Sequence, residues 1–131
     1  MGVTTDIKDL LAEQAEGWTL PEAEARVRTI ASALLTCSNN FTEAVNRQAE
    51  SKADYELKYN RALLDVRLRA QAGPKWNQAE KVAHAENESM EERRNQLAAD
   101  AQVTALRREQ DALQHVMDSL RSRIATLRQQ M

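Results

Sequence analysis

The stretch 55–81, YELKYNRALLDVRLRAQAGPKWNQAEK, decides the fold, because a strong helical pattern stops at Gly73-Pro74 and resumes a few residues later. Proline lacks a backbone donor and pushes the residue before it out of helical geometry, and here that residue is glycine, the best helix terminator. Between Pro21 and this point, and from there to the end of the sequence, no other glycine or proline occurs. The pattern therefore predicts two very long helices that meet at one corner, at residues 73–76.

The composition is typical of the same architecture. Of the 131 residues, 42% are apolar but only 4% are aromatic, while 29% are charged, which is the mixture found in coiled coils and long helices. Such helices cannot bury their apolar stripes alone, so we expect a homo-oligomer. We predict an all-α protein in one domain: a short N-terminal helix and turn in residues 1–20, and a long two-helix antiparallel hairpin with coiled-coil character in residues 21–131, assembling into an oligomer.

Local patterns place the helix starts. Residues 6–15 read as a short amphipathic helix that ends at Gly17. Thr19 can then cap the next helix, Glu22 completes a capping box, and Pro21 suits the first turn. We expect that helix to reach residue 72, with a possible kink or break at the weak helix formers 38–40.

The apolar residues of this long helix fall into stripes. Its first half has a seven-residue repeat with two columns, Val27, Leu34, Phe41 and Ile30, Cys37, Ala44. From residue 55 onward it is apolar on two faces, and two faces imply two neighbours, such as the returning helix and a second subunit. One face holds Tyr55, Tyr59, Ala62 and Val66, and the other holds Leu57, Leu64 and Leu68.

The last helix is expected from about Asn77 to Gln129. Its early stripe is thin, namely Ala79, Val82, Ala83, Met90, Leu97 and Ala101. Its later part repeats every seven residues as a coiled-coil seam, and a phase shift near residues 101–105 separates the two parts. The seam consists of Leu106, Leu113, Met117, Leu120, Ile124 and Leu127.

Several kinds of chemistry are not expected. Cys37 is the only cysteine, which rules out an internal disulfide, and its apolar register suits a small core residue. His84 and His115 lie far apart and lack a partner at metal-ligand spacing, and no glycine-rich phosphate loop occurs. We therefore predict no enzyme, no catalytic residue, no metal and no cofactor. The absence of a signal pattern or long apolar run predicts a cytoplasmic location and no membrane contact.

Basic and aromatic residues gather around the corner. Cations follow phosphates, and aromatic rings stack on unpaired bases with little sequence preference. An alternative stays open, in which the tyrosines Tyr55 and Tyr59 are seam residues, the tryptophan packs over the corner, and the cations pair with carboxylates. The candidate nucleic-acid contacts are Lys58, Arg61, Arg67, Arg69, Lys75, Trp76 and Lys81.

The corner also carries a resemblance to a known family. The basic and aliphatic segment 60–67, the turn at Gly73, the charged helix 80–94 and the tail 120–124 resemble the phage recombination-mediator family of the UvsY type, over residues 25–131. Members of that family bind single-stranded DNA and help load a RecA-like recombinase onto strands covered by single-strand-binding protein. They form rings through C-terminal helices and need no cofactor.

The resemblance implies two roles for residues of this chain. Lys58, Arg61, Arg67 and Arg69 would contact phosphate, and the seam from Leu113 to Leu127 would join subunits. A competing hypothesis is a helical adaptor, structural or inhibitory protein that acts through protein contacts only. In that case the acidic N-terminal helix and the coiled-coil seam would be the docking surfaces.

Overall fold

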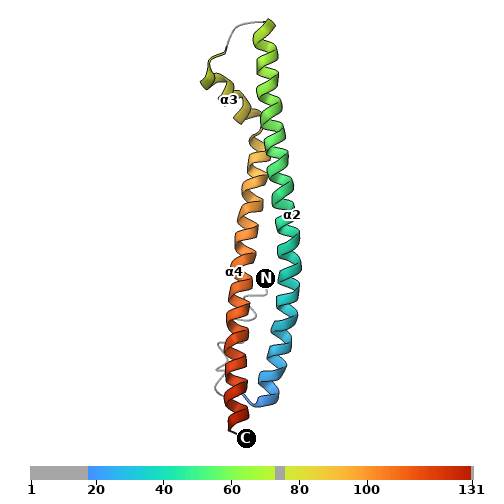
Figure 1. Cartoon of the computed structure of the whole chain (residues 1–131), viewed down its shortest axis with the longest axis vertical. Coiled ribbons are helices and arrows are strands. Elements are labelled where there is room, and N and C mark those ends of the chain that lie inside the picture. The colour runs from blue at the N-terminus through green and yellow to red at the C-terminus, as the bar shows by residue number, and fades with distance from the viewer. Residues whose placement is uncertain (1–17, 73–75, 131) are drawn as a thin grey trace. The chain divides into compact units, whose positions relative to one another are not determined.

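The computed structural model describes residues 18–72 and 76–130, and these residues are almost entirely helical (Figure 1). Helix α2 spans Leu20–Ala72, α3 spans Gln78–Glu88 and α4 spans Met90–Gln129, and no strand occurs in the described ranges. The all-α prediction is therefore confirmed for this part of the chain. The predicted N-terminal helix at 6–15 and the corner residues 73–75 lie outside the described residues.

Both predicted helix starts are confirmed by their capping contacts. The Thr19 backbone N–H donates to Glu22 Oε2 at 3.1 Å, and the Glu22 N–H donates to Thr19 Oγ1 at 3.4 Å, which is the reciprocal capping box. At the start of α3, the Glu80 N–H donates to Asn77 Oδ1 at 2.8 Å. Each contact satisfies a backbone donor that the first helical turn leaves unpaired.

The interruptions of the helices lie elsewhere than expected. Residues 38–40 sit inside α2 without a break. The single last helix expected from Asn77 to Gln129 is instead divided at Ser89, so that prediction was wrong. Ser89 is buried, and its hydroxyl donates to the Ala85 carbonyl at 2.6 Å, alongside its own backbone N–H at 3.1 Å. A serine hydroxyl that bonds back in this way competes with the helical ladder and bends it.

The contacts of the chain divide it into two compact units. Unit 1 comprises Met1–Thr42 with Thr104–Met131, and unit 2 comprises Glu43–Val103. Helices α2 and α4 each contribute a segment to both units, whereas α3 belongs to unit 2 alone. The two units are described in turn.

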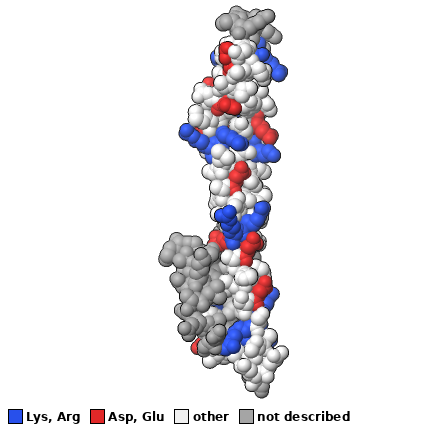
Figure 2. Space-filling model, turned by 90° about the vertical axis from the view of Figure 1, so that its left-hand side faces the viewer, with Lys and Arg blue, Asp and Glu red and all other residues white. Residues whose placement is uncertain are grey.

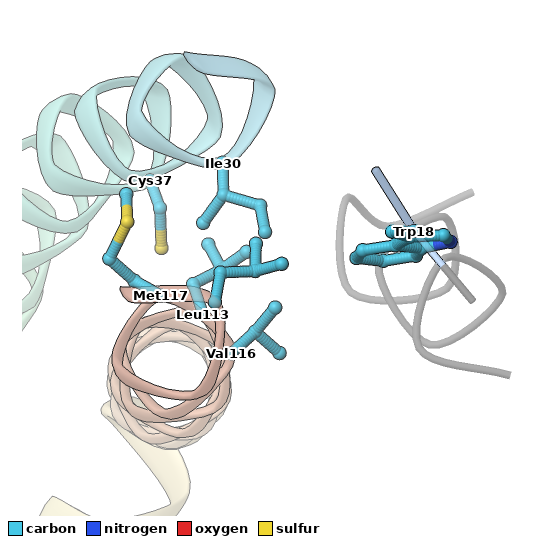
Figure 3. Packing of buried hydrophobic residues seen from close by; sticks show 7 residues of the cluster. Trp18, Ile30, Cys37, Leu113, Val116 and Met117 are labelled. Carbon is cyan, nitrogen blue, oxygen red and sulfur yellow. The ribbon is translucent and has the colours of Figure 1, made fainter. Parts of the chain in front are cut away.

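Unit 1 has a core of large side chains. Ile30 and Cys37 of α2 point toward Leu113 and Met117 of α4 (Figure 3), and all four are buried. The helices run antiparallel here, since Glu24 lies 3.4 Å from Arg128 while Phe41 lies beneath Arg107. The predicted seven-residue column through Ile30 and Cys37 is confirmed as the buried stripe.

The predicted seam provides most of the α4 side chains in this core. Four of its members are buried against the same chain, and Leu106 and Leu127 are half-buried. Their apolar surface is covered within one chain, and their role in joining subunits stays a prediction. The four buried members are Leu113, Met117, Leu120 and Ile124.

Cys37 is a core residue, as predicted. It is buried, and its Sγ lies 3.7 Å from the Leu106 carbonyl oxygen, to which the thiol can donate. Burial raises the pKa of the Cys37 thiol, and the negative charge of Glu109 raises it further. A raised pKa keeps the thiol protonated and poorly nucleophilic, which fits a packing role.

Unit 2 is built on smaller side chains. Arg47 Nη1 donates to Gln102 Oε1 at 3.3 Å, Gln48 Nε2 donates to Asp100 Oδ1 at 2.8 Å, and further along α2 the Tyr55 ring meets Arg93. Residue numbers rise on α2 as they fall on α4, so these segments are antiparallel. The buried residues are Ala44, Ala62, Val66, Ala85, Ser89, Ala99 and Val103.

In unit 2 the buried face that the sequence predicted agrees with the observed one only on α2. Ala62 and Val66 are buried beside the half-buried Tyr55 and Tyr59, which confirms that stripe. The early stripe expected on α4 was wrong, because Met90 and Leu97 are exposed. The buried and half-buried positions instead follow an unshifted three- and four-residue spacing through Ser89, and in unit 2 small or polar residues occupy them: Ala85, Ser89, Glu92, Gln96, Ala99 and Val103.

We expect Leu113→Ala to lower the free energy of unfolding by about 3 kcal/mol, because it removes a fully buried side chain from the unit 1 core. Leu35→Ala is the matched control, since Leu35 is 65% exposed in the same unit, and its effect should stay within about 0.5 kcal/mol. Urea unfolding followed by circular dichroism measures both. Equal losses from the two substitutions would contradict the described packing.

Candidate nucleic-acid interface

The predicted cations of α2 are all exposed. Lys58, Arg61, Arg67 and Arg69 lie on the part of α2 that belongs to unit 2. Nine residues separate Lys58 from Arg67, which is about two and a half helical turns, so these two side chains leave opposite sides of the helix. The sequence cluster is therefore spread around α2, and it does not form one surface.

The other three candidates differ in their surroundings. Trp76 is half-buried and immediately precedes the N-cap of α3. Lys81 is half-buried on α3, whereas Lys75 lies outside the described residues. Of these three, Trp76 is the one for which the structure gives a specific contact.

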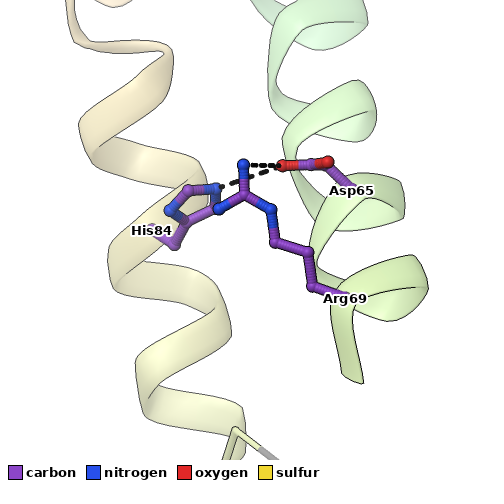
Figure 4. Close-up of polar contacts among 3 residues, drawn as sticks. All are labelled: Asp65, Arg69 and His84. Carbon is purple, nitrogen blue, oxygen red and sulfur yellow. Dashed lines mark ion pairs between the residues drawn. The ribbon is translucent and has the colours of Figure 1, made fainter. Parts of the chain in front are cut away.

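A small cluster joins α3 to α2 through His84 (Figure 4). The Trp76 ring meets the His84 ring edge-on at 5.1 Å between centroids, and His84 Nε2 lies 3.9 Å from Asp65 Oδ2. Arg69 Nη2 lies 3.1 Å from the same carboxylate oxygen. Trp76 and Arg69 thus have partners within the chain, as the alternative interpretation requires, and their part in nucleic-acid binding stays a prediction.

Lys58 and Arg61 line two grooves that also contain carboxylates. One groove adds Asp65, His84 and Glu88, and the other adds Asp54, Leu57, Glu91, Glu92 and Asn95. Within the described ranges, Lys58, Arg61 and Arg67 form neither a hydrogen bond nor an ion pair. Their charges are therefore available to a ligand, although the neighbouring acids weaken the positive potential over the two grooves.

Charge of both signs is mixed over the face shown in Figure 2. Lys and Arg form short bands there, and Asp and Glu lie beside or between them. A mixed surface of this kind gives weak long-range attraction, because the fields of neighbouring opposite charges cancel beyond about one Debye length. Any anionic ligand of this face would have to be recognised locally.

A third groove in unit 2 has a different character. Its volume is about 590 Å³, within the range of pockets that bind small molecules. Arg93 of this groove lies about 200° around α4 from Glu91 of the groove that contains Asp54, and Arg94 lies about 60° from Glu91, so Arg93 faces away from that groove while Arg94 lies between the two. The groove is lined by Tyr55, Ala83, Glu86, Asn87, Met90, Arg93 and Arg94. We call it the Tyr55 groove.

Two arginines dominate the Tyr55 groove. The Arg93 guanidinium carbon lies 5.2 Å from the Tyr55 ring centroid, and its Nη1 donates to Gln96 Oε1 at 2.9 Å. Arg94 Nη2 lies 3.4 Å from the Met90 sulfur. Among the described residues neither arginine pairs with a carboxylate, and Glu86 is the one acid in the lining. The arrangement combines cations with an aromatic ring, which suits an anionic, planar ligand.

Sequence reasoning missed Arg93 and Arg94. They follow Glu91 and Glu92 in a charged stretch that looks like a solvated helix face. Only the antiparallel pairing of α2 with α4 brings Arg93 level with Tyr55, which lies 38 residues away in sequence. No local signal sets them apart, because a second pair of adjacent arginines, Arg107 and Arg108, occurs in the same helix.

Other kinds of site are not found in the described part of the chain. Residues 18–72 and 76–130 contain no group of three or more His, Cys, Asp or Glu side chains that could hold a metal ion. None of the helices in these ranges is both long and apolar enough to cross a membrane.

Comparison with known proteins adds no relative to these observations. No family model matches the sequence, and neither a curated protein nor a solved structure matches it.

Proposed function

We propose that the protein is a non-enzymatic recombination mediator that binds single-stranded DNA and helps load a RecA-like recombinase onto strands covered by single-strand-binding protein. The observation that supports this most is the exposure of Lys58, Arg61 and Arg67 on α2, where none of the three has a polar partner among the described residues. Free cations release counterions from a phosphate backbone, and that release drives binding without sequence preference.

The remaining parts of the proposal come from the family resemblance. It supplies the recombinase and the single-strand-binding protein as partners, and it supplies assembly into a homo-oligomer of antiparallel helical hairpins through the α4 seam. The proposed mediator works without a cofactor in the cytoplasm of its host. Lys58 and Arg61, three residues apart on α2, would contact phosphates of one stretch of the strand, and Arg67 would contact a second stretch on the opposite side of the helix from Lys58, while other surfaces contact the recombinase.

Reversing the three free charges tests DNA binding. We expect the triple variant Lys58→Glu, Arg61→Glu, Arg67→Glu to lose binding to a labelled single-stranded oligonucleotide in a fluorescence anisotropy titration. Changing the same residues to Gln instead should reduce the slope of log affinity against log salt by about 2, because each phosphate contact on a single strand contributes about 0.7.

The matched control is Arg28→Glu, Arg108→Glu, Arg121→Glu, which reverses three exposed arginines of unit 1 and changes the net charge by the same amount. It should retain most of the affinity. Equal loss in the two triple variants would assign binding to net charge alone, and unchanged binding in the α2 variant would remove these residues from the interface.

A second candidate is a helical adaptor that works through protein contacts only. A stripe of three leucines favours it: Leu57, Leu64 and Leu68 are 52%, 55% and 58% exposed, although their spacing places them on one face of α2. Exposed apolar residues aligned along a helix mark a surface that another helix can cover. Because long amphipathic helices self-associate, a second copy of this chain is the occupant we propose for this stripe.

Changing the stripe to Leu57→Gln, Leu64→Gln and Leu68→Gln tests this candidate, since glutamine keeps helix propensity and removes apolar surface. We expect the solution mass, measured by sedimentation equilibrium, to fall in the triple variant and to stay unchanged in Leu35→Gln, an exposed leucine of unit 1. An unaltered mass would exclude the stripe as a subunit contact. The adaptor function further requires that the wild-type protein show no binding to single strands.

A further inference from the structure

We propose that the Tyr55 groove holds one unstacked nucleobase together with its phosphate, with the base against the Arg93 guanidinium and the phosphate at Arg94. This inference rests on the proposed binding of single-stranded DNA and gives that binding a second, base-dependent contact. It concerns residues that lie apart from Lys58 and Arg61, on another side of the helix pair.

Two contacts already hold the Arg93 side chain in place. Its guanidinium lies over the Tyr55 ring at 5.2 Å, and Gln96 accepts one of its N–H groups at 2.9 Å. A guanidinium has five N–H donors and two flat faces, so these contacts leave donors free. Arg93 is exposed and lines the groove, which makes it reachable by a ligand. Bases stack on guanidinium planes as they do on aromatic rings.

Tyr55 is in turn supported by a neighbouring ring. Its ring lies 6.0 Å from the Tyr59 ring at a tilt of 57°, and both tyrosines are half-buried on α2. The ring is thus supported from its own helix and cannot easily swing away when a ligand binds. A base placed against the exposed Arg93 guanidinium would add a stacking contact, while the Tyr55 ring holds the cation by cation–π attraction.

The charges of the groove determine where a phosphate would bind. Arg94 is exposed, and its contact within the described residues is with the Met90 sulfur at 3.4 Å, a weak acceptor. Its charge is therefore not neutralised by a carboxylate of the described chain. Glu86, the one acid of the groove, would repel a phosphate placed near it. The anionic end of a nucleotide consequently belongs at Arg94.

The rest of the lining suits the edge of a base. Met90 and Ala83 provide apolar surface, and a methionine side chain adapts to differently shaped rings. Asn87 is exposed at the groove, and its amide can both donate and accept hydrogen bonds. One amide gives little discrimination between bases, so we expect the groove to accept any base that can stack.

The experiment compares two labelled oligonucleotides of equal length, oligothymidine and an abasic strand with the same phosphates, titrated against the full-length protein. Wild type should bind oligothymidine roughly ten-fold more tightly than the abasic strand, within the range that stacking of one base supplies. Arg93→Lys keeps the charge but lacks the flat guanidinium, so it should bind both strands equally, at the affinity of the wild type for the abasic strand.

Arg94→Gln should weaken both complexes and reduce the salt slope by about 0.7, because it removes a phosphate contact and no stacking surface. The matched control is Arg108→Lys, which changes an exposed arginine of unit 1 in the same way as Arg93→Lys. It should preserve the ten-fold preference of the wild type. All three substituted residues are exposed on α4, and circular dichroism checks that each variant is folded.

The outcomes separate this inference from the proposed function. If the wild type binds both strands equally, or if Arg93→Lys keeps the full preference for oligothymidine, the base site is refuted while DNA binding stands. If the wild type binds neither strand, the proposed function fails and the base site fails with it.

Discussion

The antiparallel register between α2 and α4 is the constraint on which the site in unit 2 depends. The contacts of Arg47 with Gln102 and of Gln48 with Asp100 fix this register, and the same register places Arg93 over Tyr55. A slip of one residue along α4 would rotate the facing side chains by about 100°. Glu92 or Arg94 would then take the place of Arg93 at the Tyr55 ring. The groove is therefore a product of helix pairing, and no single helix contains it.

The two units hold their helices together by different means. Unit 1 buries large side chains such as Ile30, Leu113 and Leu120, each of which contributes roughly 1.5–3 kcal/mol by leaving water. Unit 2 buries mainly alanine, valine and serine, which remove much less apolar surface, and it relies on polar contacts at its edges. Local openings are easier where few apolar contacts are buried. The candidate ligand grooves all lie in this less strongly packed unit, where adjustment to a ligand costs little.

The sequence predicted the features that depend on residues close together in the chain. It missed the features that depend on how the helices pair. The capping box of Thr19 with Glu22 was predicted because a cap needs only residues within one turn, and the helix start near Asn77 was predicted from the glycine and proline before it. The repeat through Ile30 and Cys37 predicted the buried face of α2 in unit 1, because a stripe of apolar side chains strongly favours burial of that face. The break at Ser89 was missed because serine is common inside helices, and Ser119 makes the same bond to the preceding turn within α4 without interrupting it. The Tyr55 groove was missed because Arg93 meets Tyr55 only through helix pairing, whereas the contacts of Arg93 with Gln96 and of Arg94 with Met90 are local to α4.

The most direct test of this account is a crosslinking measurement of the register within one chain. In a Cys37→Ser background, Gln48→Cys with Asp100→Cys places two thiols where the native side chains touch at 2.8 Å. Treatment with a short bis-maleimide should give an internally bridged product of monomer mass under denaturing conditions. Gln48→Cys with Glu91→Cys, displaced by about 13 Å along α4, should react far less. Bridged dimers in place of the monomer, or equal yields from the two pairs, would contradict the described pairing of α2 with α4.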